Sequence, residues 1–174
     1  DSLYHSLNFS RHLVLDDTFH VISSTSGDLL CFFNDNEIFV MEVPWGYSNV
    51  EDVSIQDAFQ IFHYSIDEEE VGPKSSIKKV LFHPKSYRDS CIVVLKEDDT
   101  ITMFDILNSQ EKPIVLNKPN NSFGLDARVN DITDLEFSKD GLTLYCLNIT
   151  EGGDIFAFYP FLPSVLLLNE KDLN

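Results

Sequence analysis

Residue types that carry out catalysis or bind metals are present in the chain, but their spacing matches no common site. No pair of cysteines has the spacing of zinc ligands, and there is no GxSxG, P-loop or GxGxxG motif. The histidines form neither an HxH nor an HExxH pattern; they are His5, His12, His20, His63 and His83. We expect His83, which precedes a proline at a turn, to make a structural hydrogen bond. We therefore predict no catalytic residue, no metal and no cofactor.

Carboxylates are abundant, yet they do not form a recognisable calcium loop. The segments 34–37 (NDNE) and 98–105 (DDTITMFD) are acidic, but both lack the spacing and the final bidentate Glu of an EF-hand. Gly152-Gly153 is expected to form a turn rather than a phosphate-binding loop. The acidic residues are therefore expected to be solvated or to cap turns.

Charge and composition exclude several classes of partner. The 174 residues include 12 Lys and Arg against 29 Asp and Glu, which gives a net charge of −17. Nucleic acids and anionic membranes require basic clusters, so we predict no direct binding to either. No apolar run approaches the roughly 20 residues that span a bilayer. Cys31, Cys91 and Cys146 each lie in an apolar strand-like run, which is typical of reduced core cysteines in a cytosolic or nuclear protein.

Alternating apolar and polar residues predict strands rather than helices. Three segments show the same order of apolar strand, acidic or Gly-containing turn, and alternating strand; they are residues 28–43, 90–106 and 142–159. Asn, Asp and Gly in the turns tolerate the backbone angles of tight hairpins.

Further strands are expected before and after each hairpin, so the repeat has four strands at roughly 50-residue spacing. The preceding strands are expected within 18–23, 77–84 and 131–141, and the following strands within 57–65, 112–117 and 164–169. This pattern predicts an all-β fold of the β-propeller type. We expect the whole chain, 1–174, to be part of one propeller, with a last strand of a preceding blade at 3–9 and blades at 18–65, 77–117 and 131–169.

The middle unit resembles the blades of WD40-like propellers. In residues 77–106, an apolar strand leads to a His-Pro turn, and Phe104-Asp105 occupies the place of the Trp-Asp pair of that family. The chain has no true Trp-Asp and no Gly-His start, which indicates divergent blades. Three blades and one strand do not close a ring, since propellers have typically four to eight blades. We therefore interpret the chain as a fragment whose missing blades come from the rest of the protein.

One loop, residues 118–130 (KPNNSFGLDARVN), places apolar side chains among polar ones. Phe123 and Leu125 flank Gly124 in the connection between the second and third units. They either cap the gap between two blades of the chain or extend outward as anchors for another protein. Trp45 lies in the long connection after residue 43. It either packs against a blade edge or enters a pocket of a partner.

Over nearly its whole length the chain also resembles the N-terminal propellers of a family of fungal nucleoporins, which anchor other proteins on the cytoplasmic face of the nuclear pore. The resemblance is carried by residues 2–24, 41–84, 120–148 and 152–174. It implies a seven-bladed propeller, of which this chain is about three blades plus one strand, followed by coiled coil in the full protein.

The same resemblance implies two protein partners in a hetero-oligomer that supports messenger-RNA export. One is the folded, autoproteolytic-type C-terminal domain of a Gly-Leu-Phe-Gly nucleoporin, for which Phe123, Gly124 and Leu125 are the expected contact. The other is the helical C-terminal tail of a Phe-Gly filament nucleoporin, for which Asp154 is the candidate contact.

Two other functions fit a propeller. A WD40-like adaptor in a vesicle coat or a ubiquitin ligase uses the same kind of surface. A propeller glycosidase uses paired carboxylates near the axis, but no such spacing recurs along the inner strands. The loop and the nucleoporin resemblance favour a docking platform.

Overall fold

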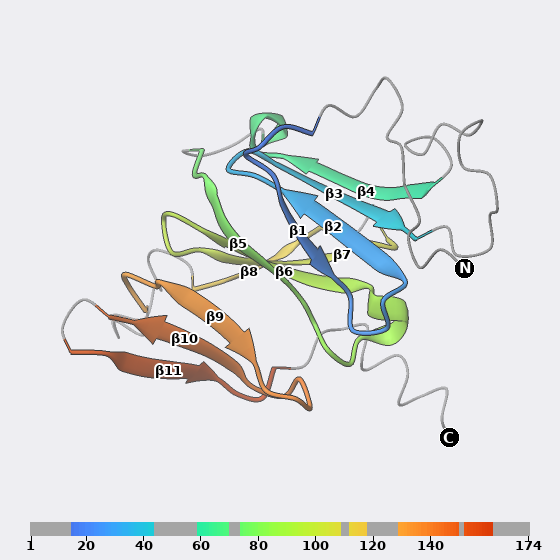
Figure 1. Cartoon of the computed structure of the whole chain (residues 1–174). Coiled ribbons are helices and arrows are strands. Elements are labelled where there is room, and N and C mark those ends of the chain that lie inside the picture. The colour runs from blue at the N-terminus through green and yellow to red at the C-terminus, as the bar shows by residue number, and fades with distance from the viewer. Residues whose placement is uncertain are drawn as a thin grey trace, which may run out of the picture.

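The computed structural model describes residues 15–43, 59–69, 74–108, 112–117, 129–149 and 152–161. In these residues the chain forms three antiparallel sheets, which confirms the all-β prediction (Figure 1). Two 3-10 helices, η1 (Ile66–Glu68) and η2 (Tyr87–Asp89), lie between strands. Among the described residues, no helix has the length and apolar character that crossing a bilayer requires.

Strands follow one another in chain order within each sheet, so neighbouring strands are also neighbours in sequence. The first sheet contains β1 (His20–Ser23), β2 (Leu29–Phe33), β3 (Glu37–Glu42) and β4 (Gln60–Ser65). The second contains β5 (Ile77–Phe82), β6 (Cys91–Lys96), β7 (Ile101–Asp105) and β8 (Ile114–Leu116). The third contains β9 (Asp134–Phe137), β10 (Leu144–Asn148) and β11 (Asp154–Phe158).

The three predicted hairpins are the β2–β3, β6–β7 and β10–β11 pairs. Strands are also present within the segments predicted before each hairpin and after the first two. The strands expected at 3–9 and 164–169 lie outside the described residues, and so does Trp45. The division of the chain into blades therefore stays a prediction.

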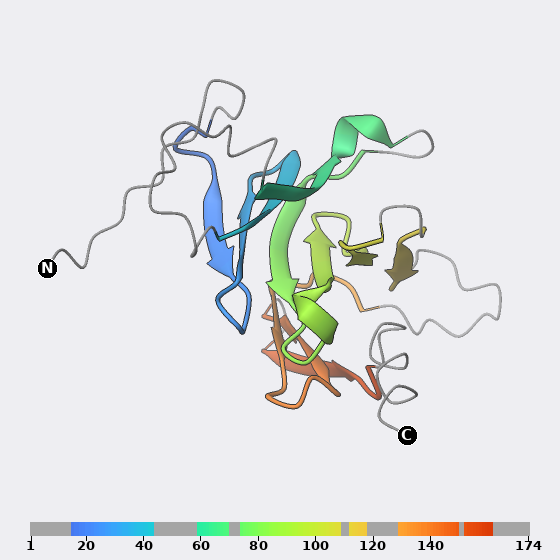
Figure 2. The ribbon, with the colours of Figure 1, turned by 90° about the vertical axis from the view of Figure 1, so that its right-hand side faces the viewer.

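The second sheet lies between the other two, and each of its faces contributes to a hydrophobic core (Figures 1 and 2). All six residues of β6 are buried. Since successive side chains of a strand point to opposite faces, Ile92 and Val94 join the core with the first sheet. Val93 and Leu95 join the core with the third sheet. Each such buried aliphatic side chain contributes about 1.5–3 kcal/mol relative to exposure.

The cysteines complete these cores and are unpaired. Cys31 and Cys146 are fully buried, and Cys91 is nearly so. Burial in apolar surroundings raises the pKa of all three thiols, that of Cys146 to about 12. A thiol with such a pKa stays protonated and unreactive near neutral pH, which is consistent with the predicted core role.

His83 links the second sheet to the third through a buried hydrogen bond, as the sequence predicted for this turn. Its Nε2 lies 2.9 Å from the Gly141 carbonyl oxygen, and its Nδ1 accepts from the Lys85 N–H at 3.1 Å. The proton therefore resides on Nε2, which donates to Gly141. Burial lowers the pKa of His83, so the neutral ring is favoured. The ring also stacks on Phe161 with centroids 5.8 Å apart.

We expect Gly141→Ala to destabilise the protein because a Cβ there would lie 2.4 Å from His83 Cε1 and the backbone φ is +75°. The clash and the left-handed backbone together should cost about 2–4 kcal/mol in the free energy of unfolding, measured by urea denaturation of the intact protein.

The matched control is Gly27→Ala, where φ is +79° but no heavy atom lies within 4 Å of the added Cβ. Its free energy of unfolding should fall by about 1–2 kcal/mol, the cost of a left-handed backbone at alanine without a clash. Equal losses for the two variants would contradict the proposed role of the His83 contact.

Candidate functional site

The predicted partner-binding loop lies mostly outside the described residues, but its two ends are described and joined. Residues 118–128, which contain Phe123, Gly124 and Leu125, are not described. The side-chain amide of Asn117 donates to the Val129 carbonyl at 2.7 Å, and the Val129 N–H donates back to Asn117 Oδ1 at 2.8 Å. Val129 itself is buried in the core between the second and third sheets. The ends of the loop are thus held side by side on a packed base.

Asparagine suits position 117 for two physical reasons. The backbone there is left-handed, with φ +54°, and Asn is one of the few non-glycine residues that adopts this conformation readily. Its side chain carries both a donor and an acceptor, so one carboxamide serves the N–H and the C=O of Val129 at once. The same Nδ2 also donates to the Asp99 carbonyl at 2.7 Å, which ties the loop base to the β6–β7 turn.

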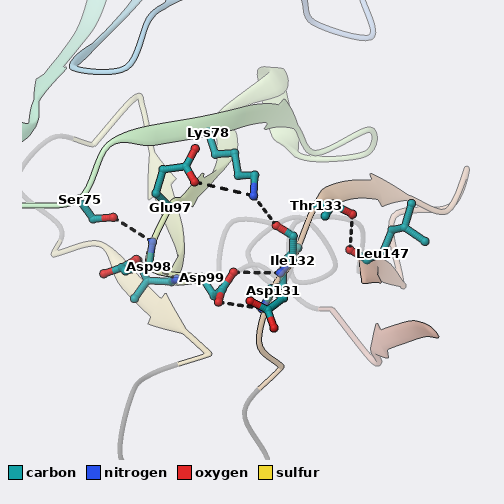
Figure 3. A network of polar contacts seen from close by, with 10 residues as sticks. Ser75, Lys78, Glu97, Asp98, Asp99, Asp131, Ile132, Thr133 and Leu147 are labelled. Atoms are coloured by element: carbon teal, nitrogen blue, oxygen red, sulfur yellow. Dashed lines mark hydrogen bonds and ion pairs between the residues drawn. The ribbon is translucent and has the colours of Figure 1, made fainter. Parts of the chain in front are cut away.

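Asp99 holds the start of the third sheet. Its two carboxylate oxygens accept hydrogen bonds from the successive N–H groups of Asp131 and Ile132, each at 2.9 Å (Figure 3). Asp99 and Asp131 both have left-handed backbones, with φ of +65° and +54°. These two charge-assisted bonds join a turn of the second sheet to the entry of β9. We call Asp99, Asn117, Val129, Asp131 and Ile132 the loop base.

Two lysines of β5, the first strand of the second sheet, make further contacts with the third sheet and the residues that precede it. Lys78 Nζ donates to the Ile132 carbonyl at 2.8 Å and lies 3.9 Å from the Glu97 carboxylate (Figure 3). Lys79 forms an ion pair with Asp134, and its hydrogen bond holds the pKa of that carboxyl below the ordinary value. The neighbouring Thr133 donates to the Leu147 carbonyl through its N–H and its hydroxyl.

Asp154, the second predicted contact, lies at the same end of the third sheet as the loop base. It is exposed, begins β11, and follows Gly152 and Gly153, which both have positive φ. Across the hairpin Asp154 faces Asn148, whose side-chain amide donates to the Asn130 carbonyl at 2.9 Å. Asn148 therefore links the hairpin that contains Asp154 to the C-terminal end of the loop.

The chemistry offered by this end of the molecule is that of a contact surface. The Asp99 carboxylate is already engaged by two backbone N–H groups, and Lys78 and Lys79 are engaged by Ile132 and Asp134. Within the described ranges, no group of three or more His, Cys, Asp or Glu residues is arranged to hold a metal ion.

Comparison with known proteins relates the whole chain to a nucleoporin. No protein-family model matches it. The chain is 99% identical over its 174 residues to nucleoporin NUP82 of Saccharomyces cerevisiae, and it spans 24% of the length of that protein. The predicted nucleoporin resemblance is confirmed.

Two solved structures support the fold. The yeast heterotrimeric Nup82-Nup159-Nup116 nucleoporin complex contains a chain that matches with a TM-score of 0.85 and 98% identity, over 100% of this chain and 39% of that one. The Chaetomium thermophilum Nup82 NTD-Nup159 TAIL-Nup145N APD complex matches with a TM-score of 0.52 and 16% identity, over 82% of this chain and 32% of that one. The second match bears on the fold alone. The all-β propeller class predicted from sequence is confirmed.

The loop base was not identified from the sequence. Its signal is present in hindsight: Asn117 ends a short apolar strand, and Asp99 closes the β6–β7 turn. Asn and Asp after strands are common turn residues, however, and nothing in their spacing shows that residues 99, 117 and 129 meet.

We expect Asn117→Gly to loosen the loop base without straining its backbone, because glycine also adopts positive φ. The variant loses three hydrogen bonds at about 0.5–1.5 kcal/mol each, so the free energy of unfolding should fall by about 2–4 kcal/mol. Hydrogen–deuterium exchange should become faster at Val129 in the intact protein.

The control is Asn130→Ala. Asn130 is exposed, and only its backbone carbonyl takes part in the described contacts. Exchange at Val129 that is equally fast in both variants would show that the Asn117 side chain does not hold the loop.

Proposed function

We propose that this chain is part of a non-catalytic docking platform on the cytoplasmic face of the nuclear pore, where it anchors Phe-Gly nucleoporins and so supports messenger-RNA export. The observation that carries this proposal is the near-identity to NUP82 over the full chain, together with the matching chain in a complex with Nup159 and Nup116. The chain spans about a quarter of the length of that relative. The proposal assigns the remaining blades of a seven-bladed ring and the coiled coil, which the resemblance implies, to the rest of the protein.

The loop at 118–130 is proposed to bind the folded C-terminal domain of Nup116. Burying Phe123 and Leu125 in a partner pocket would contribute roughly 3–6 kcal/mol before ordering costs. The loop base reduces those costs, because Asn117 and Val129 already hold the two ends together in the free protein. Gly124 permits the sharp backbone turn that would present both side chains on one side.

Asp154 is proposed to contact the helical tail of Nup159. It is exposed at the start of β11, directly after two glycines in left-handed conformations. A carboxylate in this position favours a cationic side chain or the N-terminus of a helix. Its cross-strand neighbour Asn148 donates to the Asn130 carbonyl, so Asp154 lies near the base of the Phe123 loop. Two partners docked here would lie next to each other.

We expect the double variant Phe123→Ala with Leu125→Ala to weaken binding of the purified folded domain of Nup116 by at least about 30-fold, since hot-spot residues carry about 2 kcal/mol or more. Isothermal titration calorimetry of the full-length protein measures this. The melting temperature should stay close to that of the wild type.

Asn120→Ala with Asn121→Ala is the control in the same loop, and its affinity should be unchanged. Unaltered binding by the first variant would reject the loop as the contact. A fall in melting temperature by many degrees would instead place Phe123 and Leu125 in the core of the propeller.

A further inference from the structure

A concave site lies between the first and second sheets, at the end opposite to the loop base. The cavity has a volume of about 420 Å³, within the usual range of ligand sites, and described residues of both sheets line it. It lies beside η2 and the end of β7, whereas the loop base adjoins the turn between β6 and β7. The proposed function makes no use of this site.

The wall formed by η2 is held in a strained conformation. Arg88 and Asp89 are consecutive non-glycine residues with left-handed φ of +52° and +55°. Such residues persist only where the surroundings enforce them, and they occur often at binding sites. Here the enforcing contact crosses between the sheets, because Ser26 of the β1–β2 turn donates a hydrogen bond to the buried Asp89 carboxylate. This hydrogen bond ties the two sheets together at the wall of the cavity.

The lining of the cavity is apolar in one part. Leu29 is buried at its base, Val43 and Ile61 are half-buried, and Leu107 is 43% exposed. A leucine so exposed at the mouth of a cavity can be covered by an apolar side chain that enters it.

The rest of the lining is charged, with an excess of carboxylates. Asp28 and Glu42 are exposed on the first-sheet side, and none of the ion pairs among the described residues uses either of them. Arg88 is exposed on the opposite wall and is likewise free of an ion pair with any described residue. A cationic side chain would be attracted to Asp28 and Glu42. The guanidinium of Arg88 on the opposite wall can donate hydrogen bonds to peptide carbonyls.

We propose that this intersheet groove binds a short segment of a partner protein in which an arginine or lysine adjoins a leucine-sized apolar residue. The cation would pair with Asp28 and Glu42, the apolar side chain would cover Leu107 and Ile61, and Arg88 would donate to the backbone of the segment.

The charge of the chain argues for an external occupant. Residues 44–58, which connect Val43 to Phe59 in the sequence, carry Glu51, Asp52 and Asp57 and no Lys or Arg. The two carboxylates of the groove would repel that segment. With 12 basic and 29 acidic residues, the 174 residues of this chain offer few cationic segments of their own.

A phage-displayed library of random heptapeptides tests the proposal on the immobilised full-length protein, with counter-selection on Leu107→Arg. Leu107 is exposed, so this variant keeps the fold while adding a charge at the mouth of the groove. The surviving peptides should contain Arg or Lys next to Leu, Ile or Phe. The proposal is wrong if no peptide survives counter-selection, or if the survivors are acidic.

The most enriched peptide, labelled with fluorescein, is then titrated by fluorescence anisotropy. Asp28→Asn with Glu42→Gln should weaken its binding by about 10-fold, and raised salt should weaken it further. Asp17→Asn with Glu136→Gln changes the net charge equally at exposed positions elsewhere and should have no more than about a 2-fold effect. Equal weakening by both double variants would show that the net negative charge of the protein attracts the peptide, rather than the carboxylates of the groove. Tighter binding by Trp45→Ala would show that segment 44–58 occupies the groove. Either result would overturn the proposal.

Discussion

The burial of β6 on both faces is the constraint on which the rest of the structure depends. Its side chains alternate between two cores, so this strand has no face left for water, and each neighbouring sheet packs against it. Even the polar end of β6 is enclosed: Lys96 is buried and forms an ion pair with Glu69, which also accepts a hydrogen bond from Tyr64. Burial, reinforced by Glu69, raises the pKa of the Tyr64 hydroxyl.

The sheets are also joined at their ends by polar contacts, and these contacts adjoin the two proposed docking surfaces. At one end, Asp99 and Asn117 join the second sheet to the third and close the base of the Phe123 loop. At the other end, Ser26 and Asp89 join the first sheet to the second and form one wall of the intersheet groove. Both surfaces rest on buried core residues, Val129 at one end and Leu29 at the other, while turns and strand ends supply their exposed groups. A scaffold can therefore present different contacts at its two ends without changing its interior.

The regular part of this structure was predictable from the sequence because local physics determines it. Alternation in residues such as those of β3 and β10, with Asn, Asp and Gly between strands, locates the hairpins. The apolar run of β6 indicates a strand buried on both faces. The left-handed backbones at Asp89 and Asn117 were not predictable, because the partners of these side chains lie outside their own turns: Ser26 for Asp89, and Asp99 and Val129 for Asn117. The assignment of Phe123 and Leu125 to a partner came from the family resemblance, since a loop containing Phe-Gly-Leu fits an inward cap equally well.

In the proposed function, the stack of sheets presents Phe123 to another protein. The most direct test is photo-cross-linking in cells with benzoyl-phenylalanine incorporated in place of Phe123 of the full-length protein. The account predicts a covalent product with the folded domain of Nup116. Cross-links confined to the protein itself, at residues of its own blades, would contradict it.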